Sequence, residues 1–280
     1  MPNVDKNLQC ILFADDTTIL CRSDNTDSLN ALLNTTGIRK LTAWFNANRL
    51  SLNVDKTVLM LFGKTEKKIN IQKNLIDIKI GDKKIPFSDT VKFLGIHIDP
   101  YLKWSVHCNK LRTKISQAIG IIRKIKKFLS KTVLLKMYMA FINSHLSYGT
   151  EIWGFGLKTD INKIIGIQKR ALKIICGNVH FKKLNILPID KYIKFRTLKL
   201  MHSVKSNLVP VSMSDIFLKH SHALNTRHAN DFLVRGLLCR DSVVVKGPTL
   251  YNNLNSNLRN EPSIHVFCRK LKKLLFENTN

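Results

Sequence analysis

The sequence predicts an α+β fold in which a strand-rich first part precedes a mostly helical second part. Over the first hundred residues, short apolar runs separated by turn residues predominate, and one long segment has helical periodicity. From Trp104 onward, apolar residues recur at helical spacing instead. A chain of 280 residues can bury a sizeable core, and its length favours about two domains.

The first hundred residues predict a hairpin, an amphipathic helix and several short strands. Two apolar runs, Cys10–Phe13 and Ile19–Cys21, flank a polar centre, which indicates two strands joined by a tight turn. Turn and N-cap residues at 24–27 precede a helical pattern that continues to Asn48. A polar excursion, Lys64–Lys73, follows one of the later strands. These later strands are expected over 58–62, 76–80, 85–87 and 91–98.

Helices dominate the prediction from residue 104 onward. The stripe of the first helix consists of Trp104, Cys108, Leu111, Ile115, Ala118, Ile122, Ile125 and Leu129. Further helices are expected over 131–147, 160–176 and 191–205. Beyond Pro210 the periodicity weakens, and we predict a short strand at Val243–Val245 and a final amphipathic helix at Ser263–Phe276. We therefore divide the chain into three parts, 1–100, 101–208 and 209–280.

The charge of the chain points to a polyanionic partner. The chain has 46 Lys and Arg against 19 Asp and Glu, a formal net charge of +27, and residues 101–200 alone hold 21 basic and 3 acidic residues. Such an excess favours nucleic acid as the partner. The alternative is that the cations are solvated helix faces, the commonest role of a charge run.

No feature of the sequence indicates a membrane protein, a secreted protein or a zinc site. No apolar run reaches the roughly 18 residues of a membrane span, and the N-terminus lacks the layout of a signal peptide. The six cysteines form no Cys-x-x-Cys pair, which favours reduced thiols, and the nine histidines are scattered, which favours structural or solvent-exposed roles. We expect an intracellular protein of the cytoplasm or nucleus that has no membrane partner.

Two adjacent acids, Asp15 and Asp16, lie at the predicted tip of the first hairpin. Polar residues are ordinary at turns, so a plain surface turn explains them. Acids enclosed by apolar strands are less ordinary, because like charges are brought together in a buried place only when a cation compensates them. The residues alone leave both the turn and a metal site open.

Several motifs resemble those of one enzyme family. Phe13-Ala14-Asp15-Asp16 resembles motif C, the Phe/Tyr-Ala-Asp-Asp hairpin of reverse transcriptases, in the form used by non-LTR (LINE-like, jockey-like) retrotransposons. Two segments follow in the family's order and spacing: Leu50–Thr57, similar to motif D, and Val91–Asp99, similar to motif E, the primer grip. Others resemble the thumb and C-terminal regions: Leu102–His107, Leu146–Gly154, Asn225–Arg227 and Gly247–Asn252.

This resemblance implies a fold and a reaction. It implies a partial polymerase palm over 1–100, a basic helical thumb-like domain over 101–208 and a C-terminal extension over 209–280. The intact enzyme would be an RNA-directed DNA polymerase that uses an RNA template, an RNA–DNA or DNA primer duplex, dNTPs and Mg²⁺. Two metal ions stabilise the attacking and leaving oxygens in such chemistry. By resemblance Asp15 and Asp16 are catalytic metal ligands, and Asp15 is the firmer ligand.

The resemblance also implies that this chain is incomplete as a polymerase. The family's other metal-binding Asp belongs to motif A, upstream of motif C and together with the fingers, and the sequence shows no such motif. We therefore expect a truncated enzyme, its C-terminal portion, in which metal binding and nucleotide addition are weak or absent.

Two further sites follow from motifs D and E. Lys56 matches the motif D lysine, which in the family is thought to protonate the departing pyrophosphate as a general acid. A surface lysine beside Asp55 is the alternative. Phe93, Leu94 and Gly95 would form the primer grip, where glycine leaves room for the primer. A buried strand with one glycine is the alternative there.

The helical part predicts contacts with nucleic acid. Contact of basic side chains with phosphates would position a template–primer duplex without reading its sequence. The residues predicted to make this contact are Lys110, Lys114, Arg123, Lys124 and Lys127. The leading hypothesis is thus a polymerase segment that is inactive alone. The alternatives are a non-catalytic nucleic-acid-binding remnant and a structural α+β module whose Asp-Asp pair is only a turn.

Overall fold

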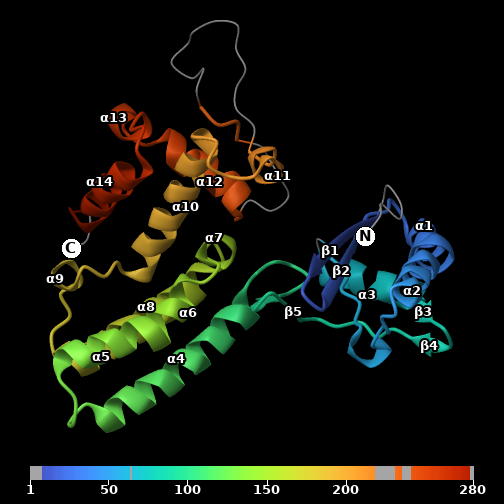
Figure 1. Ribbon diagram of the computed structural model, residues 1–280, viewed down its shortest axis with the longest axis horizontal. Coiled ribbons are helices and arrows are strands. Elements are labelled where there is room, and N and C mark those ends of the chain that lie inside the picture. The colour runs from blue at the N-terminus through green and yellow to red at the C-terminus, as the bar shows by residue number, and fades with distance from the viewer. Residues whose placement is uncertain (1–7, 64, 218–230, 235–240, 278–280) are drawn as a thin grey trace, which may run out of the picture. The chain divides into compact units, whose positions relative to one another are not determined.

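The structure is a computed structural model that describes residues 8–63, 65–217, 231–234 and 241–277 (Figure 1). The chain divides into two structural units, Met1–Tyr101 and Leu102–Asn280. The first unit holds the strand pairs, and the second is built from helices. This order agrees with the predicted α+β class. The finer division into palm, thumb and extension stays a prediction.

The first unit combines short antiparallel hairpins with helical segments. The strand pairs are β1 (Leu8–Phe13) with β2 (Asp16–Cys21), β3 (Lys79–Ile80) with β4 (Lys83–Lys84), and β5 (Val91–Phe93) with β6 (Ile96–Ile98). The helical segments are α1 (Thr26–Ala31), the π-helical η1 (Leu32–Gly37), α2 (Ile38–Ala47), the 3-10 turn η2 (Val54–Lys56) and α3 (Glu66–Leu75).

Two small apolar clusters hold the first unit together. In one, Leu41 of α2 packs with Leu8, Cys10 and Ile19 of the first hairpin. The other is centred on Ile76, Ile78 and Ile85 near the second hairpin. Since Leu8 pairs with Cys21 at the open end of the β1–β2 hairpin, this packing anchors the hairpin at the end opposite its turn.

Several predictions for the first unit were wrong. The segment 85–87, predicted as a strand, contains only a bridge at Phe87, and β3 pairs instead with β4, Lys83–Lys84. The strand expected over 58–62 is reduced to one parallel bridge, in which Leu59 accepts a hydrogen bond from the backbone of Ser88 (2.8 Å). The segment predicted as a polar excursion is helical from Glu66 to Leu75. Its Lys, Glu and Gln residues favour a helix. Because the helix buries only Ile69, the sequence shows no apolar stripe that would have predicted it.

The second unit is a set of packed helices. The longer ones are α4 (Ser105–Ile125), α5 (Lys131–Tyr138), α8 (Lys158–Cys176), α10 (Ile189–Lys205), α12 (Val243–Asn252) and α14 (Ile264–Glu277). The shorter ones are the π-helical η3 (Met139–Asn143), α6 (Ser144–Ser147), α7 (Thr150–Trp153), α9 (Phe181–Leu184), α11 (Val211–Ser214) and α13 (Ser256–Arg259).

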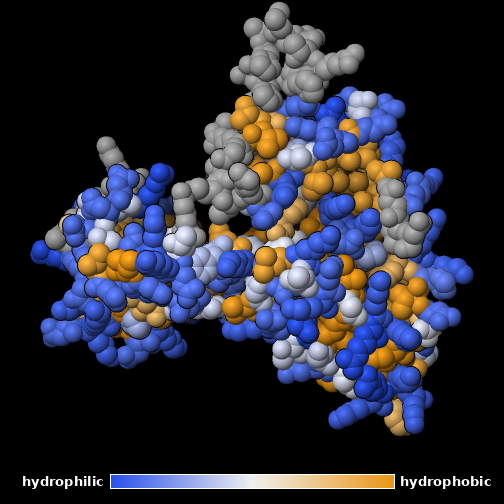
Figure 2. Space-filling view, turned by 180° about the vertical axis from the view of Figure 1, so that it is seen from behind, coloured by the Kyte–Doolittle hydropathy of each residue, from blue (hydrophilic) through white to orange (hydrophobic). Residues whose placement is uncertain are grey.

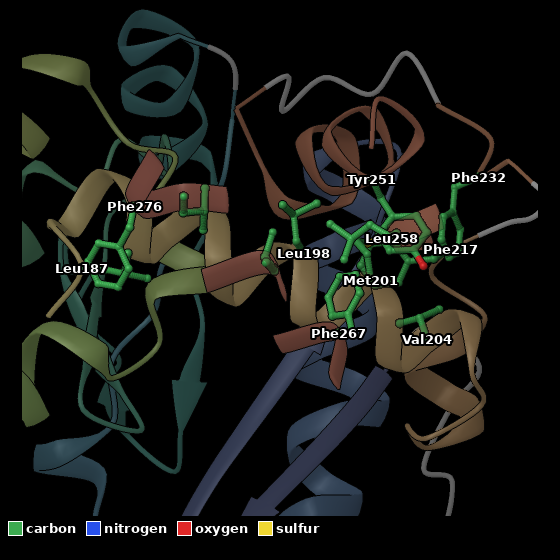
Figure 3. Close-up of a cluster of buried hydrophobic side chains, with 12 residues drawn as sticks. Leu187, Leu198, Met201, Val204, Phe217, Phe232, Tyr251, Leu258, Phe267 and Phe276 are labelled. Atoms are coloured by element: carbon green, nitrogen blue, oxygen red, sulfur yellow. The ribbon is translucent and has the colours of Figure 1, made fainter. Parts of the chain in front are cut away.

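Most of the predicted apolar stripe of the first long helix faces the core of this unit, but Leu129, its last predicted member, lies beyond the end of α4 and is exposed. Cys108, Leu111, Ile115, Ala118 and Ile122 of α4 are all buried, as is Trp104 just before it. A second part of the core joins α10, α12 and α14. Figure 3 shows Met201, Tyr251 and Phe267 close together in this part of the core, with Leu198 between them and Phe276, which lies beside Leu187.

One prediction for the second unit was wrong and another was confirmed. Val243–Val245, predicted as a strand, opens helix α12, because its packing against α10 outweighs the strand preference of three valines. The Ser242 carbonyl accepts the first helical hydrogen bonds, including one from the backbone of Lys246 (2.8 Å). The final helix is confirmed as α14. The predicted C-terminal motif Asn225–Arg227 lies outside the described residues.

None of the helices in the described ranges is long and apolar enough to cross a membrane.

Candidate functional site

A two-residue turn places the two predicted acids at the tip of the first hairpin. Phe13 pairs with Asp16 in the register, so Ala14 and Asp15 form the turn between β1 and β2. Ala14 has φ 52°, a left-handed conformation that costs a residue other than glycine about 1–2 kcal/mol. The predicted tight turn is therefore confirmed, and it brings the two acids together.

Both carboxylates are exposed, and so are the apolar residues beside them. Leu12 and Phe13, next to the turn, are 44% and 60% exposed. Among the residues that the structure describes, Asp15 and Asp16 are therefore flanked by the two strands but not buried, which agrees with a surface turn and leaves the metal site a prediction. Near its open end, the hairpin packs against Leu41 of α2.

The two acids are suited to a metal ion only as part of a larger ligand set. Mg²⁺ prefers hard oxygen ligands, which Asp15 and Asp16 supply. Within the described ranges, no group of three or more His, Cys, Asp or Glu is placed to hold a metal ion. Further ligands would have to come from another part of the protein.

The segment that resembles motif D is a short turn capped by Asn53. The Asn53 side chain accepts a hydrogen bond from the backbone N–H of Lys56 (3.2 Å), and Thr57 Oγ1 donates to the Asn53 carbonyl (2.9 Å). Lys56 is exposed, while its neighbour Asp55 forms an ion pair with Lys83 of β4. Lys56 thus extends into solvent from an ordered turn, where both the general-acid role and the plain surface role stay open.

The predicted primer-grip residues lie at the turn between β5 and β6. Phe93 pairs with Ile96, so Leu94 and Gly95 form a two-residue turn. Their φ angles are 44° and 83°, and positive φ at both central residues matches the twist of a tight hairpin. The single strand expected over 91–98 is thus a hairpin. Gly95 is exposed and lacks a side chain, so the backbone of this turn is accessible.

The five basic residues predicted to contact phosphates are all exposed, but they do not share one face. They are Lys110, Lys114, Arg123 and Lys124 of α4 and Lys127 just after it. At about 100° per residue, Lys110, Lys114 and Lys124 fall within an arc of about 80° around the helix axis. Arg123 is about 140° from Lys110 on the same basis. A duplex lying along one side of α4 would meet the first three.

One cation of α8, Lys163, forms an ion pair with the buried carboxylate of Asp160. Asp160 accepts hydrogen bonds from Ser105 Oγ (2.6 Å) and from Lys163 Nζ (3.0 Å), which joins the start of α8 to the start of α4. The Ser105 hydrogen bond, assisted by Lys163, lowers the pKa of Asp160 against the opposing effect of burial. Three exposed cations of α8 have no acidic partner in the described part of the chain: Lys169, Arg170 and Lys173.

Two cations at the turn between α4 and α5 were missed by the prediction. Lys126 and Lys131 are exposed there. They belong to a set of five cations within nine residues, which consists of Arg123, Lys124, Lys126, Lys127 and Lys131. No acidic residue occurs between Asp99 and Glu151. The high local density of positive charge in the sequence could have predicted this set. Helical periodicity does not reveal it, because the cations continue past the end of α4.

Comparison with known proteins relates this chain to the RNA-directed DNA polymerases of retrotransposons. Three such polymerases, from elements named jockey and X-element, and a Pol polyprotein from a retrotransposable element named R1 match part of the chain, so the resemblance predicted from the motifs is confirmed. No protein-family model matches the chain, and no solved structure matches it.

Three relatives illustrate the extent of the similarity. The RNA-directed DNA polymerase from mobile element jockey of Drosophila melanogaster is 25% identical over 173 residues, 59% of this chain and 18% of that protein. The probable RNA-directed DNA polymerase from transposon X-element of the same organism is 25% identical over 103 residues, 36% and 11% of the two chains. The retrovirus-related Pol polyprotein from type-1 retrotransposable element R1 4 of Nasonia vitripennis is 29% identical over 126 residues, 40% and 32% of the two chains. The matches thus span between 11% and 32% of these relatives' length.

Proposed function

We propose that this chain is the part of a non-LTR retrotransposon reverse transcriptase that carries the catalytic hairpin, the motif D and E turns and a basic thumb. The similarity to RNA-directed DNA polymerases of mobile elements carries this proposal. The position of Asp15 and Asp16 at one tight turn supports it. The partners of the intact enzyme would be an RNA template, an RNA–DNA or DNA primer duplex and dNTPs.

Each motif residue has a role in this proposal. Asp15, with Asp16 as the weaker ligand, would hold Mg²⁺, which when bound stabilises the attacking and leaving oxygens of nucleotidyl transfer. Lys56 would hold a proton on Nζ for the departing pyrophosphate. The accessible backbone of Leu94 and Gly95 would support the primer end.

We further propose that the chain alone does not add nucleotides. A two-metal site needs more carboxylates than one adjacent pair, and the described residues add none near the hairpin tip. The exposed Leu12 and Phe13 beside the acids favour coverage of this tip by a further segment of the polymerase.

A non-catalytic nucleic-acid-binding remnant is the second candidate. The charge of the second unit favours it, because residues 102–280 hold 32 basic and 8 acidic residues. In that case the basic helices would still contact phosphates. The acids of the hairpin would then serve only as its turn.

Primer extension tests the first candidate. The full chain is supplied with a primed RNA template, Mg²⁺ and dNTPs, and duplex binding is recorded in the same samples. Asp15→Ala is compared with wild type, and Asp82→Ala is the matched control because Asp82 is also an exposed acid at a hairpin turn. Salt-sensitive binding without extension is the expected result.

The other outcomes separate the candidates. Extension that Asp15→Ala abolishes and Asp82→Ala leaves intact would establish catalysis and overturn the proposed inactivity. If extension occurs once the missing part of the polymerase is added to the chain in the presence of Mg²⁺, the first candidate is favoured over the remnant. Absence of both extension and binding would leave only the structural α+β module.

A further inference from the structure

The turn between α4 and α5 presents an aromatic ring to solvent. Phe128 is 83% exposed, and no other large hydrophobic side chain in the described part of the chain is more exposed. A single exposed apolar residue is ordinary on a protein surface. The surroundings of Phe128 therefore decide whether its ring has a role.

The backbone on both sides of Phe128 is held in place. At the end of α4, Lys126 donates to the Ile122 carbonyl (2.9 Å) and Phe128 to the Ile125 carbonyl (2.9 Å). At the start of α5, the Ser130 hydroxyl accepts the backbone N–H of Val133 (3.4 Å) and caps the helix. The ring thus stands on an ordered turn, which limits the entropy lost when it contacts a ligand.

The cations around this ring indicate the chemistry of the ligand. Arg123, Lys124, Lys126, Lys127 and Lys131 surround Phe128 in the sequence, and none has an acidic partner among the described residues. Figure 2 shows that hydrophilic residues cover much of the surface of this unit, with hydrophobic residues between them. A single ring within such a charge cluster fits a polyanion that also offers flat apolar faces, which is a nucleic acid.

We propose that Phe128 stacks on an unpaired base of bound nucleic acid while the flanking cations contact the phosphates on either side. The proposal rests on the nucleic-acid binding proposed above and names the part of the ligand that this turn meets. In a paired duplex the base faces are covered by neighbouring bases, so a ring on a turn reaches a base only where the strand is single. Stacking does not read sequence, because every base has such a face.

The test uses the full chain and two probes. One is a fully paired RNA–DNA hybrid, and the other is the same hybrid with a single-stranded RNA template extension. We expect Phe128→Ala to lower the affinity for the extended probe about tenfold and to change the affinity for the paired probe by less than about twofold. Phe128→Trp should keep the wild-type affinity for both probes. Phe141→Ala is the matched control, because Phe141 is also an exposed aromatic residue, 53% exposed, in the second unit.

Two further measurements distinguish stacking from charge. Phe128→Ala should leave the salt dependence of binding unchanged, because the ring neutralises no phosphate. A 2-aminopurine base in the extension should lose fluorescence when wild-type protein binds and should keep it with Phe128→Ala.

The possible results separate this inference from the proposed function. If Phe128→Ala weakens both probes equally, or neither of them, base stacking by Phe128 is overturned while nucleic-acid binding stands. If wild-type protein binds neither probe, nucleic-acid binding and base stacking both fail.

Discussion

At the scale of the residue, His202 is a buried imidazole, one nitrogen of which has no hydrogen-bond partner in the described part of the chain. Its ring stacks on Phe267 with centroids 4.0 Å apart, and its Nδ1 is 3.1 Å from the Tyr251 hydroxyl. Because that hydroxyl donates to a backbone carbonyl (3.2 Å), we assign the proton to Nδ1, and Nε2 has no partner within the described residues. Burial lowers the pKa of His202, Lys205 adds to this effect and Glu261 opposes it.

We predict that the second unit loses stability as the pH falls through the ordinary histidine pKa of 6.5. Below that pH, His202 binds a proton in the unfolded chain but stays neutral in the folded chain. The free energy of unfolding therefore decreases by at most about 1.4 kcal/mol per pH unit from this group, until the pH reaches the lowered pKa. Urea unfolding followed by tryptophan fluorescence measures the effect, since Trp104 and Trp153 are buried in this unit.

His202→Gln provides the control for this prediction because glutamine does not titrate. Subtracting its pH dependence from that of wild type cancels the contributions of all other groups. A difference of zero between about pH 7.5 and about pH 5.5 would contradict the prediction.

Gln168 illustrates a residue whose role could not be predicted from the sequence. Its side-chain nitrogen donates to the Tyr138 hydroxyl (3.2 Å) and to the Leu187 carbonyl (3.1 Å), and its oxygen accepts the N–H of Ile189 (2.9 Å). A glutamine within a helix is usually solvent-facing. Its burial here depends on partners from other segments, and helical periodicity contains no information about them.

At the scale of the element, two glycines of the second unit should respond oppositely to alanine. Gly154, which follows α7, is buried, and an added Cβ would lie 2.7 Å from Cγ1 of Ile193 and would also clash with the Thr150 carbonyl. Gly166 of α8 is exposed, and its added Cβ would meet nothing within 4 Å. We expect Gly154→Ala to lower the free energy of unfolding by about 1–3 kcal/mol through overpacking. We expect Gly166→Ala to raise it by about 1 kcal/mol through helix propensity.

Denaturant unfolding of both variants checks this pair of predictions. Neither glycine needs positive φ, so the loss expected for Gly154→Ala would arise from packing, which is absent at Gly166. Stabilisation by both substitutions would show that α7 and α10 do not pack as closely as described.

The elements that the sequence predicted well are those with local causes. The β1–β2 hairpin follows from two apolar runs around a polar turn, and the burial of α4 follows from its stripe. The mispredicted elements have causes that an apolar pattern does not show, such as packing against a distant segment or a turn within an apolar run. Val243–Val245 has strand propensity but becomes helical against α10, and the Leu94–Gly95 turn divides a run whose apolar residues alone predict one strand.

At the scale of the whole molecule, the sequence predicted which residues meet at the tip of the first hairpin but not how the charged residues of the second unit are arranged. The sequence indicated that Asp15 and Asp16 lie at one tip, which the structure confirms. It could not show that Lys163 pairs with Asp160, because that ion pair is fixed by where Ser105 and the start of α8 meet. Ion pairs between segments depend on how the elements pack, which the sequence does not show. Motifs such as Asp15-Asp16 depend only on the order of residues along the chain, so they can be recognised in the sequence.

The uneven charge of the chain leads to a prediction about where nucleic acid binds. Residues 1–101 hold 14 basic and 11 acidic residues, whereas residues 102–280 hold 32 and 8. If binding is localised on α4, the position of a removed lysine matters. If it reflects net charge alone, position does not matter, because any two lysines remove the same charge.

The double variant Lys114→Ala with Lys124→Ala separates these cases when it is compared with Lys67→Ala and Lys68→Ala. The first pair lies on one arc of α4, and the second pair lies exposed on α3 without acidic partners in the described residues. For an RNA–DNA hybrid followed by fluorescence anisotropy, the slope of log K against log salt should fall by about 0.9 for each phosphate that the α4 variant no longer neutralises. The α3 variant should leave the slope unchanged. Equal changes in the two variants would mean that the basic helix is one cationic surface among several, and the assignment of a thumb-like binding face to α4 would then be wrong.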